Sequence, residues 1–232
     1  MSNLCIIPTR GGSKRIPRKN IKEFLGKPII AYSIETALKS KLFDEIMVST
    51  DDKEIATIAK SYGATVPFLR SKKNSDDFAS TFDVIAEVIN EYKKNNRFFD
   101  NVCCIYACAP FVTSNKLKQA YKKLVKTKFD VVFPVMEYSF PIQRAVKKDD
   151  NDSIEMLNKE HTTTRSQDLE RSYHDAGQFY WMNIEIVLKK KSLMTDNTGA
   201  VVISELEGQD IDSLTDWKLA ELKYKLINED VS

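Results

Sequence analysis

Histidine and paired-cysteine motifs are nearly absent from this chain. Its 232 residues include two histidines and four cysteines, and none of the cysteines forms a C-x-x-C pair. A zinc site with histidine and cysteine ligands is therefore not expected. Because three of the four cysteines lie in or beside apolar runs, we predict buried, reduced thiols, which suits a cytoplasmic protein.

Long hydrophobic runs and an excess of charge of either sign are also missing. No apolar run approaches the roughly 20 residues that a membrane helix needs, and the opening stretch MSNLCIIPTR has no feature of a secretory leader. With 35 Lys and Arg against 33 Asp and Glu, the net charge is only +2, so composition gives nucleic-acid binding no support. These absences predict a cytoplasmic protein that binds neither a membrane nor nucleic acid.

Strand-like and helix-like segments alternate along most of the chain. Short apolar runs end in polar turns, and helical apolar stripes of about 10 to 15 residues separate them, which is typical of repeated βαβ units. The pattern predicts an α/β fold, with a mostly parallel sheet covered by helices on both faces. The predicted strands are 3–7, 45–50, 64–68, 101–107, 130–135, 177–182 and 200–204; the predicted helices are 27–40, 51–63, 81–94, 113–126, 184–191 and 215–227.

The alternation stops between residues 137 and 176, where the chain is polar and has no regular period. Loops of this length without structure are uncommon inside compact domains, and apolar residues such as Leu157 and Tyr173 give the segment something to pack. We predict a catalytic domain formed by 1–136 and 177–232, with 137–176 inserted as a small dimerisation or substrate-covering arm. A disordered loop is the alternative.

The first strand-like run leads into TRGGSKRIPRKN, which combines two adjacent glycines with dense positive charge. Gly11 and Gly12 would let the backbone approach a phosphate closely, and Arg10, Lys14 and Lys19 can neutralise several phosphate charges. The segment matches neither the Walker A motif nor G-x-G-x-x-G. A polyanionic ligand is predicted here, and a solvated basic turn is the alternative.

A second candidate site lies near the C-terminus, in the segment QDID. Residues two apart in an extended segment point to the same side, so Asp210 and Asp212 can aim both carboxylates at one point. Magnesium suits carboxylates combined with phosphate oxygens. The pair is predicted to bind Mg²⁺, and the alternative is a pair of turn or cap residues ahead of the last helix.

Several segments together resemble the cytidylyltransferases that activate sialic-acid-like sugars. They are IIPTRGGSKRIPRKNI with GKPIIAYSIETAL, then VSTDDKEIA, and finally QDIDSLTDWKLAE. Residues 165–181, RSQDLERSYHDAGQFYW, are similar to the pseudaminic acid branch of that family. The resemblance implies a Rossmann-like nucleotidyltransferase fold and a Mg-dependent reaction of CTP with pseudaminic acid, a nine-carbon sugar acid. The products would be pyrophosphate and CMP-pseudaminic acid, which would serve surface or flagellar glycosylation. The resemblance also implies that the protein forms a homodimer.

The resemblance also assigns roles to single residues. Lys19 is implied to stabilise the departing pyrophosphate, with Arg10 and Asp212 as the other catalytic residues. The residues implied to bind CTP are Arg10, Gly11, Gly12, Ser13, Lys14, Asn20, Arg70 and Thr81. The last three match family positions close to the cytidine, although Thr81 is also placed to cap a helix and Arg70 to lie at the surface.

The sugar-facing part departs from the common sialic acid type. Gln178 stands where that type carries a methyl group, and only Arg165 remains of a paired arginine in the preceding arm. Arg165, Gln178 and Tyr180 are predicted to contact the sugar. The alternatives are the same chemistry on legionaminic, N-acetylneuraminic or 3-deoxy-manno-octulosonic acid, or a catalytically silent module that binds CTP or a nucleotide sugar.

Overall fold

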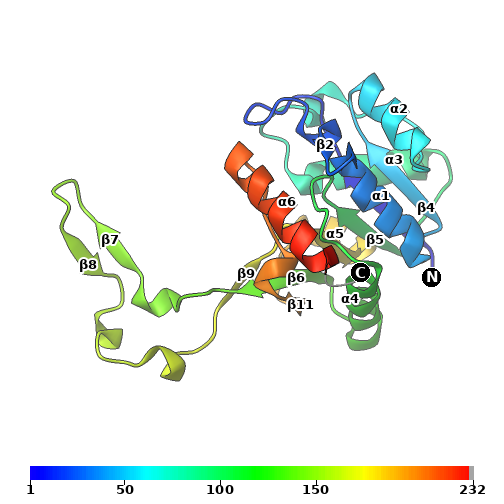
Figure 1. Cartoon of the computed structure of the whole chain (residues 1–232). Coiled ribbons are helices and arrows are strands. Elements are labelled where there is room, and N and C mark those ends of the chain that lie inside the picture. Colours follow the sequence, from blue (N-terminus) through cyan, green and yellow to red (C-terminus); the bar gives the residue numbers. More distant parts are fainter. Residues whose placement is uncertain (230–232) are drawn as a thin grey trace.

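A sheet of seven strands forms the centre of the computed structural model, which describes residues 1–229 (Figure 1). In chain order the strands are β1 (Asn3–Pro8), β4 (Glu45–Ser49), β5 (Asn101–Ile105), β6 (Val131–Glu137), β9 (Tyr173–Asp175), β10 (Phe179–Asn183) and β11 (Thr198–Ile203). Their spatial order is β11-β6-β10-β5-β1-β4, and β9 pairs with the outer end of β6. Only β9 and β10 run antiparallel to their neighbours, which confirms a mostly parallel sheet in an α/β fold.

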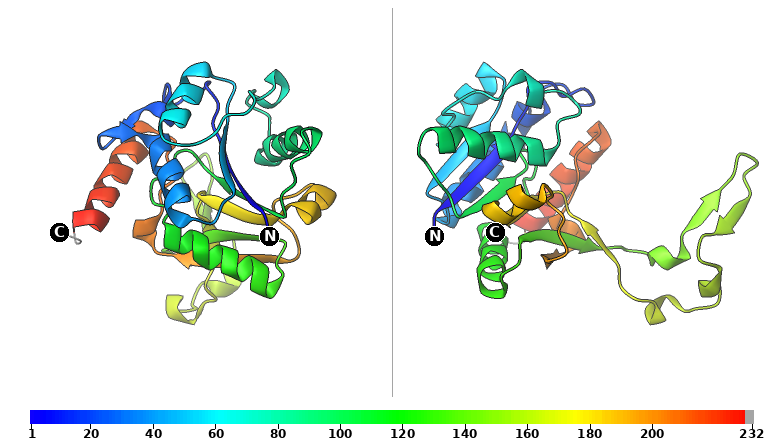
Figure 2. Two further views of the ribbon diagram at one scale, coloured as in Figure 1. Left: turned by 90° about the vertical axis from the view of Figure 1, so that its right-hand side faces the viewer. Right: turned by 180° about the vertical axis from the view of Figure 1, so that it is seen from behind.

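Helices cover both faces of the sheet (Figure 2). They are α1 (Ile29–Ser40), α2 (Lys53–Ser61), α3 (Thr81–Lys94), α4 (Ser114–Thr127), α5 (Ile184–Lys190) and α6 (Leu214–Glu229). The apolar stripes of α1, α2 and α4 pack on one face, and those of α3 and α5 on the other. Among residues 1–229, no helix has the length and apolar character required to cross a membrane.

Alternate residues of β1 face the two helical layers. Cys5 and Ile7 pack with α1, α2 and α4, whereas Leu4 and Ile6 pack with α3 and α5, and all four side chains are fully buried. The run is apolar throughout because a strand covered by helices on both sides has no face in water. The basic loop begins directly after β1, at the carboxyl end of this buried strand.

A third apolar cluster holds the basic loop against α6. Its buried members include Ile16 from the loop, Phe24 from the turn that follows, and Ile211 and Trp217 from the other end of the chain. The rings of Phe24 and Trp217 meet edge to face, with 5.6 Å between their centroids. Through this cluster, the loop after β1 and the segment before α6 lie side by side.

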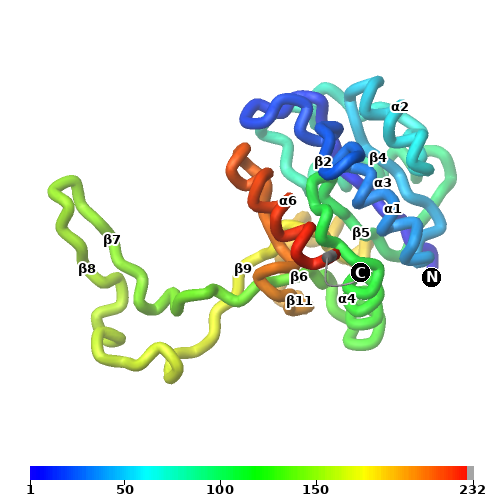
Figure 3. Tube along the Cα trace, viewed as in Figure 1, coloured from blue at the N-terminus to red at the C-terminus, as the bar shows by residue number. Residues whose placement is uncertain are grey.

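Residues 137–176 form an arm that projects from the body of the molecule (Figure 3). The chain leaves through β6, turns at a hairpin near the tip and returns through β9. The arm contains strands and short helices and is not the structureless loop that the sequence also allowed. Its role in dimerisation or in covering a substrate, and the corresponding domain division, stay predictions.

Short hairpins and 3-10 helices that the sequence analysis did not predict complete the fold. They are the hairpins β2 (Glu23–Phe24) with β3 (Lys27–Pro28) and β7 (Val146–Lys148) with β8 (Ile154–Met156), and the 3-10 helices Lys19–Ile21, Lys72–Asn74, Ile142–Arg144, Lys159–His161, Ser166–Asp168 and Glu205–Glu207. The predicted strand at 64–68 is wrong, because only Thr65 makes a bridge, to Met47. Pro67 lacks the N–H group that a continuing ladder would need.

Candidate active site

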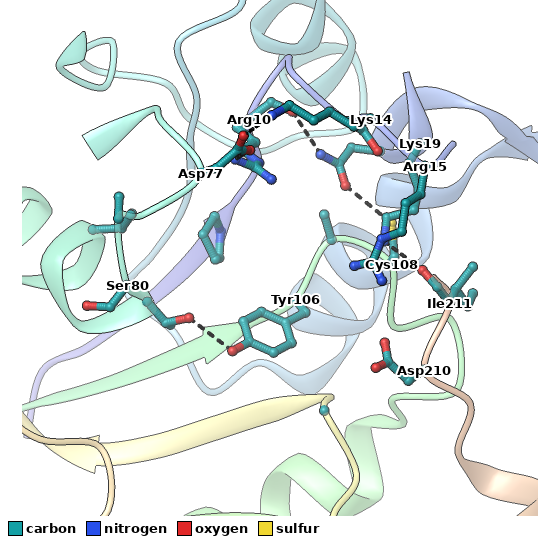
Figure 4. A pocket seen from close by; sticks show the side chains of 18 of the residues that line it. Arg10, Lys14, Arg15, Lys19, Asp77, Ser80, Tyr106, Cys108, Asp210 and Ile211 are labelled. Carbon is teal, nitrogen blue, oxygen red and sulfur yellow. Dashed lines mark hydrogen bonds and ion pairs between the residues drawn. The ribbon is translucent and has the colours of Figure 1, made fainter. Parts of the chain in front are cut away.

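A cavity of about 480 Å³ opens where β1 and β5 end (Figure 4). Pro8, the last residue of β1, and Tyr106, which directly follows β5, both line it. Ligands of open α/β sheets bind beyond the carboxyl ends of the strands, and this cavity has that position. The predicted CTP-binding residues that line it are Arg10, Ser13, Lys14, Asn20, Arg70 and Thr81, together with the predicted catalytic residue Lys19.

Two cations of the basic loop converge on one carboxylate. Arg10 Nη1 lies 2.5 Å from Asp77 Oδ1 and also donates to the carbonyl of Asp76 at 3.0 Å. Lys14 forms an ion pair with the other oxygen of Asp77. The hydrogen bond from Lys14, followed by that from Arg10, lowers the pKa of Asp77. Both cations thus point at a single anionic group, which is the arrangement that a phosphate requires.

Lys19 contacts the segment that carries the predicted metal ligands. Its ammonium donates to the carbonyl of Ile211 at 2.6 Å and lies 3.6 Å from Asp212 Oδ1, which Arg15 Nη2 approaches to 2.8 Å. Asp210 lines the cavity beside them. Loss of solvation, and then the charge of Asp212, raise the pKa of Asp210. The negative charge of Asp212 thus disfavours the ionised form of Asp210.

Asp210 and Asp212 are not the cap of α6 that the sequence also allowed. Ser213 caps this helix, because its hydroxyl accepts from the N–H of Asp216 at 3.2 Å and the Asp216 carboxylate accepts from the N–H of Ser213 at 2.7 Å. In the part of the chain that the structure describes, no group of three or more His, Cys, Asp or Glu side chains forms a metal cage. Magnesium binds through one or two carboxylates and completes its octahedron with water and phosphate oxygens. Two aspartates beside a strongly basic loop fit that ion.

The two glycines of the loop have different surroundings. The N–H of Gly11 donates to Asp51 Oδ1 at 3.0 Å, and a methyl group at Gly11 would lie 2.7 Å from Asp52 Oδ2. Asp52 is held in place because its carboxylate caps α2 and accepts a hydrogen bond from Arg18. The hydrogen bond from Arg18 also lowers the pKa of Asp52 to about 2. A methyl group at Gly12 would meet no described atom within 4 Å. Of the two loop glycines, only Gly11 is required by packing.

The predicted cytidine-binding residues are held by specific hydrogen bonds. Arg70 is only 9% exposed and donates to both the hydroxyl and the carbonyl of Ser49, so the alternative of a surface position is wrong. Ser80 caps α3, whereas the hydroxyl of Thr81 lies 3.0 Å from Tyr106 Oη at the wall of the cavity. The alternative of Thr81 as the helix cap is therefore also wrong.

Asn20 closes the basic loop on itself. Its amide donates to the carbonyl of Arg10 at 3.0 Å, and its side-chain oxygen accepts from the thiol of Cys108 at 3.2 Å. Burial raises the pKa of the Cys108 thiol to about 12, so the thiol remains a donor at neutral pH. Both ends of the Asn20 side chain are thus engaged in shaping the wall of the cavity.

The three predicted sugar contacts lie outside this cavity. Arg165 is in the arm, Gln178 is 3% exposed and donates to the carbonyl of Glu207 at 2.6 Å, and the Tyr180 hydroxyl lies 2.5 Å from Asp175 Oδ2. None of the three belongs to the described residues that line the cavity. Their contact with a sugar stays a prediction.

A second hollow of about 330 Å³ adjoins the main cavity. The two share Gly177 and Asp210, and the second is also lined by His174 and Lys223. A ligand lying across both would pass directly over the carboxylate of Asp210. The two hollows thus offer room for ligands on either side of Asp210.

The cytidylyltransferase family model matches residues 4–208, and the chain belongs to that family. A pseudaminic acid cytidylyltransferase of Campylobacter jejuni is 45% identical over 229 residues, which cover 99% of each chain. The CMP-N,N'-diacetyllegionaminic acid synthase of Legionella pneumophila is 31% identical, again over 99% of each chain. The family resemblance seen in the sequence is confirmed.

A solved structure supports the fold independently. The CMP:2-keto-3-deoxy-manno-octonic acid synthetase complexed with CTP superposes with a TM-score of 0.71, covering 99% of this chain and 100% of that one. Only 16% of the aligned residues are identical, so this likeness concerns the fold. It confirms the predicted nucleotidyltransferase architecture.

Three residues of the site were not predicted. Asp77 lies in a loop whose sequence indicates only polarity, and its partners are far away along the chain. Arg15 belongs to the basic cluster, but nothing local indicates its pairing with Asp212. Tyr106 had a usable signal, because it stands near the end of the apolar strand predicted at 101–107, and ligands of α/β sheets bind beyond the carboxyl ends of the strands.

The two glycines provide a matched pair of variants. Gly11→Ala should lower the free energy of unfolding by about 1–2 kcal/mol, because the new methyl group displaces Asp52 from its capping position. Gly12→Ala should leave stability unchanged or slightly raised, since alanine restricts the unfolded chain. Thermal melting without nucleotide measures both. Equal melting temperatures for the two variants would contradict the packing described for Gly11.

Proposed function

We propose that this protein transfers the cytidylyl group of CTP to pseudaminic acid, giving CMP-pseudaminic acid and pyrophosphate for surface or flagellar glycosylation. The observation that carries the proposal is the meeting of Arg10, Lys14 and Lys19 with Asp210 around one cavity, with Asp212 Oδ1 3.6 Å from the Lys19 ammonium. The 45% identity to a pseudaminic acid cytidylyltransferase over the whole chain supports this choice of sugar. Other nine-carbon sugar acids and 3-deoxy-manno-octulosonic acid remain the alternatives.

Each residue of the site has a separate role in the proposed reaction. Arg10 and Lys14 bind the triphosphate in place of Asp77, and Lys19 stabilises the charge that develops on the departing pyrophosphate. The sugar hydroxyl attacks the α-phosphorus in line and releases its proton to solvent, while the bond from the α-phosphorus to the α–β bridging oxygen breaks and pyrophosphate leaves with that oxygen. Asp210 and Asp212 would hold Mg²⁺, which supplies charge neutralisation at the phosphate oxygens and favours the ionised hydroxyl.

The second hollow is the proposed site of the sugar acid. It adjoins the nucleotide cavity at Gly177 and Asp210, so an acceptor bound there would present its hydroxyl beside the aspartate pair. Tyr180 and Arg165 are further proposed contacts, the latter from the arm of a second copy. A silent binding module is less well supported, because it would have no need of Lys19 beside two acidic side chains.

Pyrophosphate release from CTP and Mg²⁺ with a panel of sugar acids tests the proposal. The panel contains pseudaminic, legionaminic, N-acetylneuraminic and 3-deoxy-manno-octulosonic acids. We expect kcat/KM to be highest for pseudaminic acid, and no release when magnesium is omitted. A higher value for another sugar would correct the substrate. No release with any of them would favour the silent module.

Asp212→Asn should lower turnover by at least about a hundredfold, equivalent to about 3 kcal/mol of transition-state stabilisation. Stability should change little, because the pair that Asp212 makes with Arg15 is largely exposed to solvent. Ser213→Ala is the matched control, since it removes the cap of α6 and should lower the melting temperature while turnover is retained. Full turnover of Asp212→Asn would rule out the metal assignment.

We further propose a homodimer in which each arm reaches the active site of the other subunit. The arm exposes Phe140 at 84%, Ile154 at 66% and Leu157 at 59%, and a second subunit that packed against the arm would remove these apolar side chains from water. Phe140→Ser combined with Leu157→Ser should shift the mass measured by light scattering from dimer to monomer. A wild-type monomer with full activity at micromolar concentration would refute this arrangement.

The proposed location of the reaction is the cytoplasm. All four cysteines are free, and three of them are buried, as is usual for proteins of reducing compartments.

A further inference from the structure

The segment that carries Asp210 and Asp212 has no regular secondary structure of its own. Residues 208–212 lie between a short 3-10 helix and α6, in neither a helix nor a strand. Backbone carbonyl groups in such a segment need partners other than a ladder or a helix. In the turn that leads into it, these partners are the side chains of Gln178 and Lys223.

Gln178 supplies the first of these contacts. Its amide nitrogen donates to the carbonyl of Glu207 at 2.6 Å, and its side chain is 3% exposed. Its backbone is held from the other side, because its own carbonyl accepts from the N–H of Tyr106 at 2.9 Å. The preceding Gly177, at φ +62°, makes the turn between β9 and β10 that directs this side chain away from the main cavity.

Lys223 of α6 supplies two further contacts to backbone carbonyl groups of this turn. Its ammonium donates to the carbonyls of Glu205 and Gly208, each at 3.0 Å. Gly208 is packed closely as well, since a methyl group there would lie 2.5 Å from the sulfur of Met136. Three carbonyls within four residues are thus bound by two side chains, immediately before the aspartate pair.

We infer that Gln178 and Lys223 are positioning residues that hold the turn 205–208 and thereby place Asp210 at the wall of the cavity and Asp212 beside Lys19. The inference rests on the proposed function, in which these aspartates hold Mg²⁺ beside the triphosphate. It gives Gln178 a role through the turn in place of direct contact with the sugar. Its burial and its bond to Glu207 favour this role, because a sugar contact would require the amide to leave a buried carbonyl without a partner.

The test measures metal binding without turnover. Binding of Mn²⁺ with CTP, in the absence of sugar, is followed by the electron paramagnetic resonance signal of free Mn²⁺ for Gln178→Met and Lys223→Met. Both variants should bind about tenfold more weakly than the wild type, as expected when the groups that orient metal ligands are removed. For Gln178→Met, the KM for the sugar acid, measured separately with saturating magnesium, should change less than twofold; Lys223 lines the second hollow, so Lys223→Met is judged by metal binding alone.

Matched controls separate this effect from general loss of structure. Lys223→Arg keeps two donors and should bind Mn²⁺ with CTP within twofold of the wild type. Gln143→Met removes the same kind of bond, from a glutamine amide to the carbonyl of Glu170, but in the arm, and should also have no effect. Melting temperatures identify any variant that fails to fold. If Gln178→Met fails to fold, Lys223→Met alone tests whether the turn 205–208 positions the aspartates.

The outcomes distinguish the inference from the function on which it rests. If Asp212→Asn binds Mn²⁺ with CTP as the wild type does, the metal assignment fails. If Asp212→Asn binds weakly while Gln178→Met and Lys223→Met bind normally, the positioning role is wrong. A raised KM for the sugar with unchanged metal binding in Gln178→Met would assign that residue to the sugar instead.

Discussion

The positive charge of the loop after β1 is the constraint on which this site depends. Five cations lie within ten residues, and such a loop would repel itself unless anionic groups from elsewhere in the fold balanced it. Carboxylates from three distant segments do so. The pairs are Arg10 and Lys14 with Asp77, Arg18 with Asp52, and Arg15 and Lys19 with Asp212.

These pairs differ in what they can do. Asp52 also caps α2 and packs against Gly11, so its pairing with Arg18 is part of the scaffold. Asp77 has no comparable anchor in a helix, and its pairs with Arg10 and Lys14 are well exposed to solvent. Exposed pairs contribute little to stability. A triphosphate, with more charge and more acceptor oxygens, can therefore replace Asp77 while the Asp52 contacts keep the loop in shape.

The sequence predicted best what short-range chemistry determines. The helix at 81–94 and the placement of the basic loop at the end of a buried strand both follow from local patterns. The pairing of Arg10 with Asp77 and of Lys19 with Asp212 joins segments far apart in the chain, so no local pattern indicates it. The direction of the Gln178 side chain depends on the bend at Gly177 between β9 and β10, which both run antiparallel to β6. The sequence predicted a single strand over 177–182 and no such bend.

Calorimetric titration of the wild-type protein with CTP and with CMP, in the same magnesium buffer, tests the central claim most directly. Both ligands share the cytidine and the α-phosphate, so the difference isolates the two outer phosphates. If the cations around the cavity bind the triphosphate, CTP should bind at least about a hundredfold more tightly, corresponding to about 3 kcal/mol from charge-assisted hydrogen bonds. Equal affinities for the two nucleotides would contradict the account.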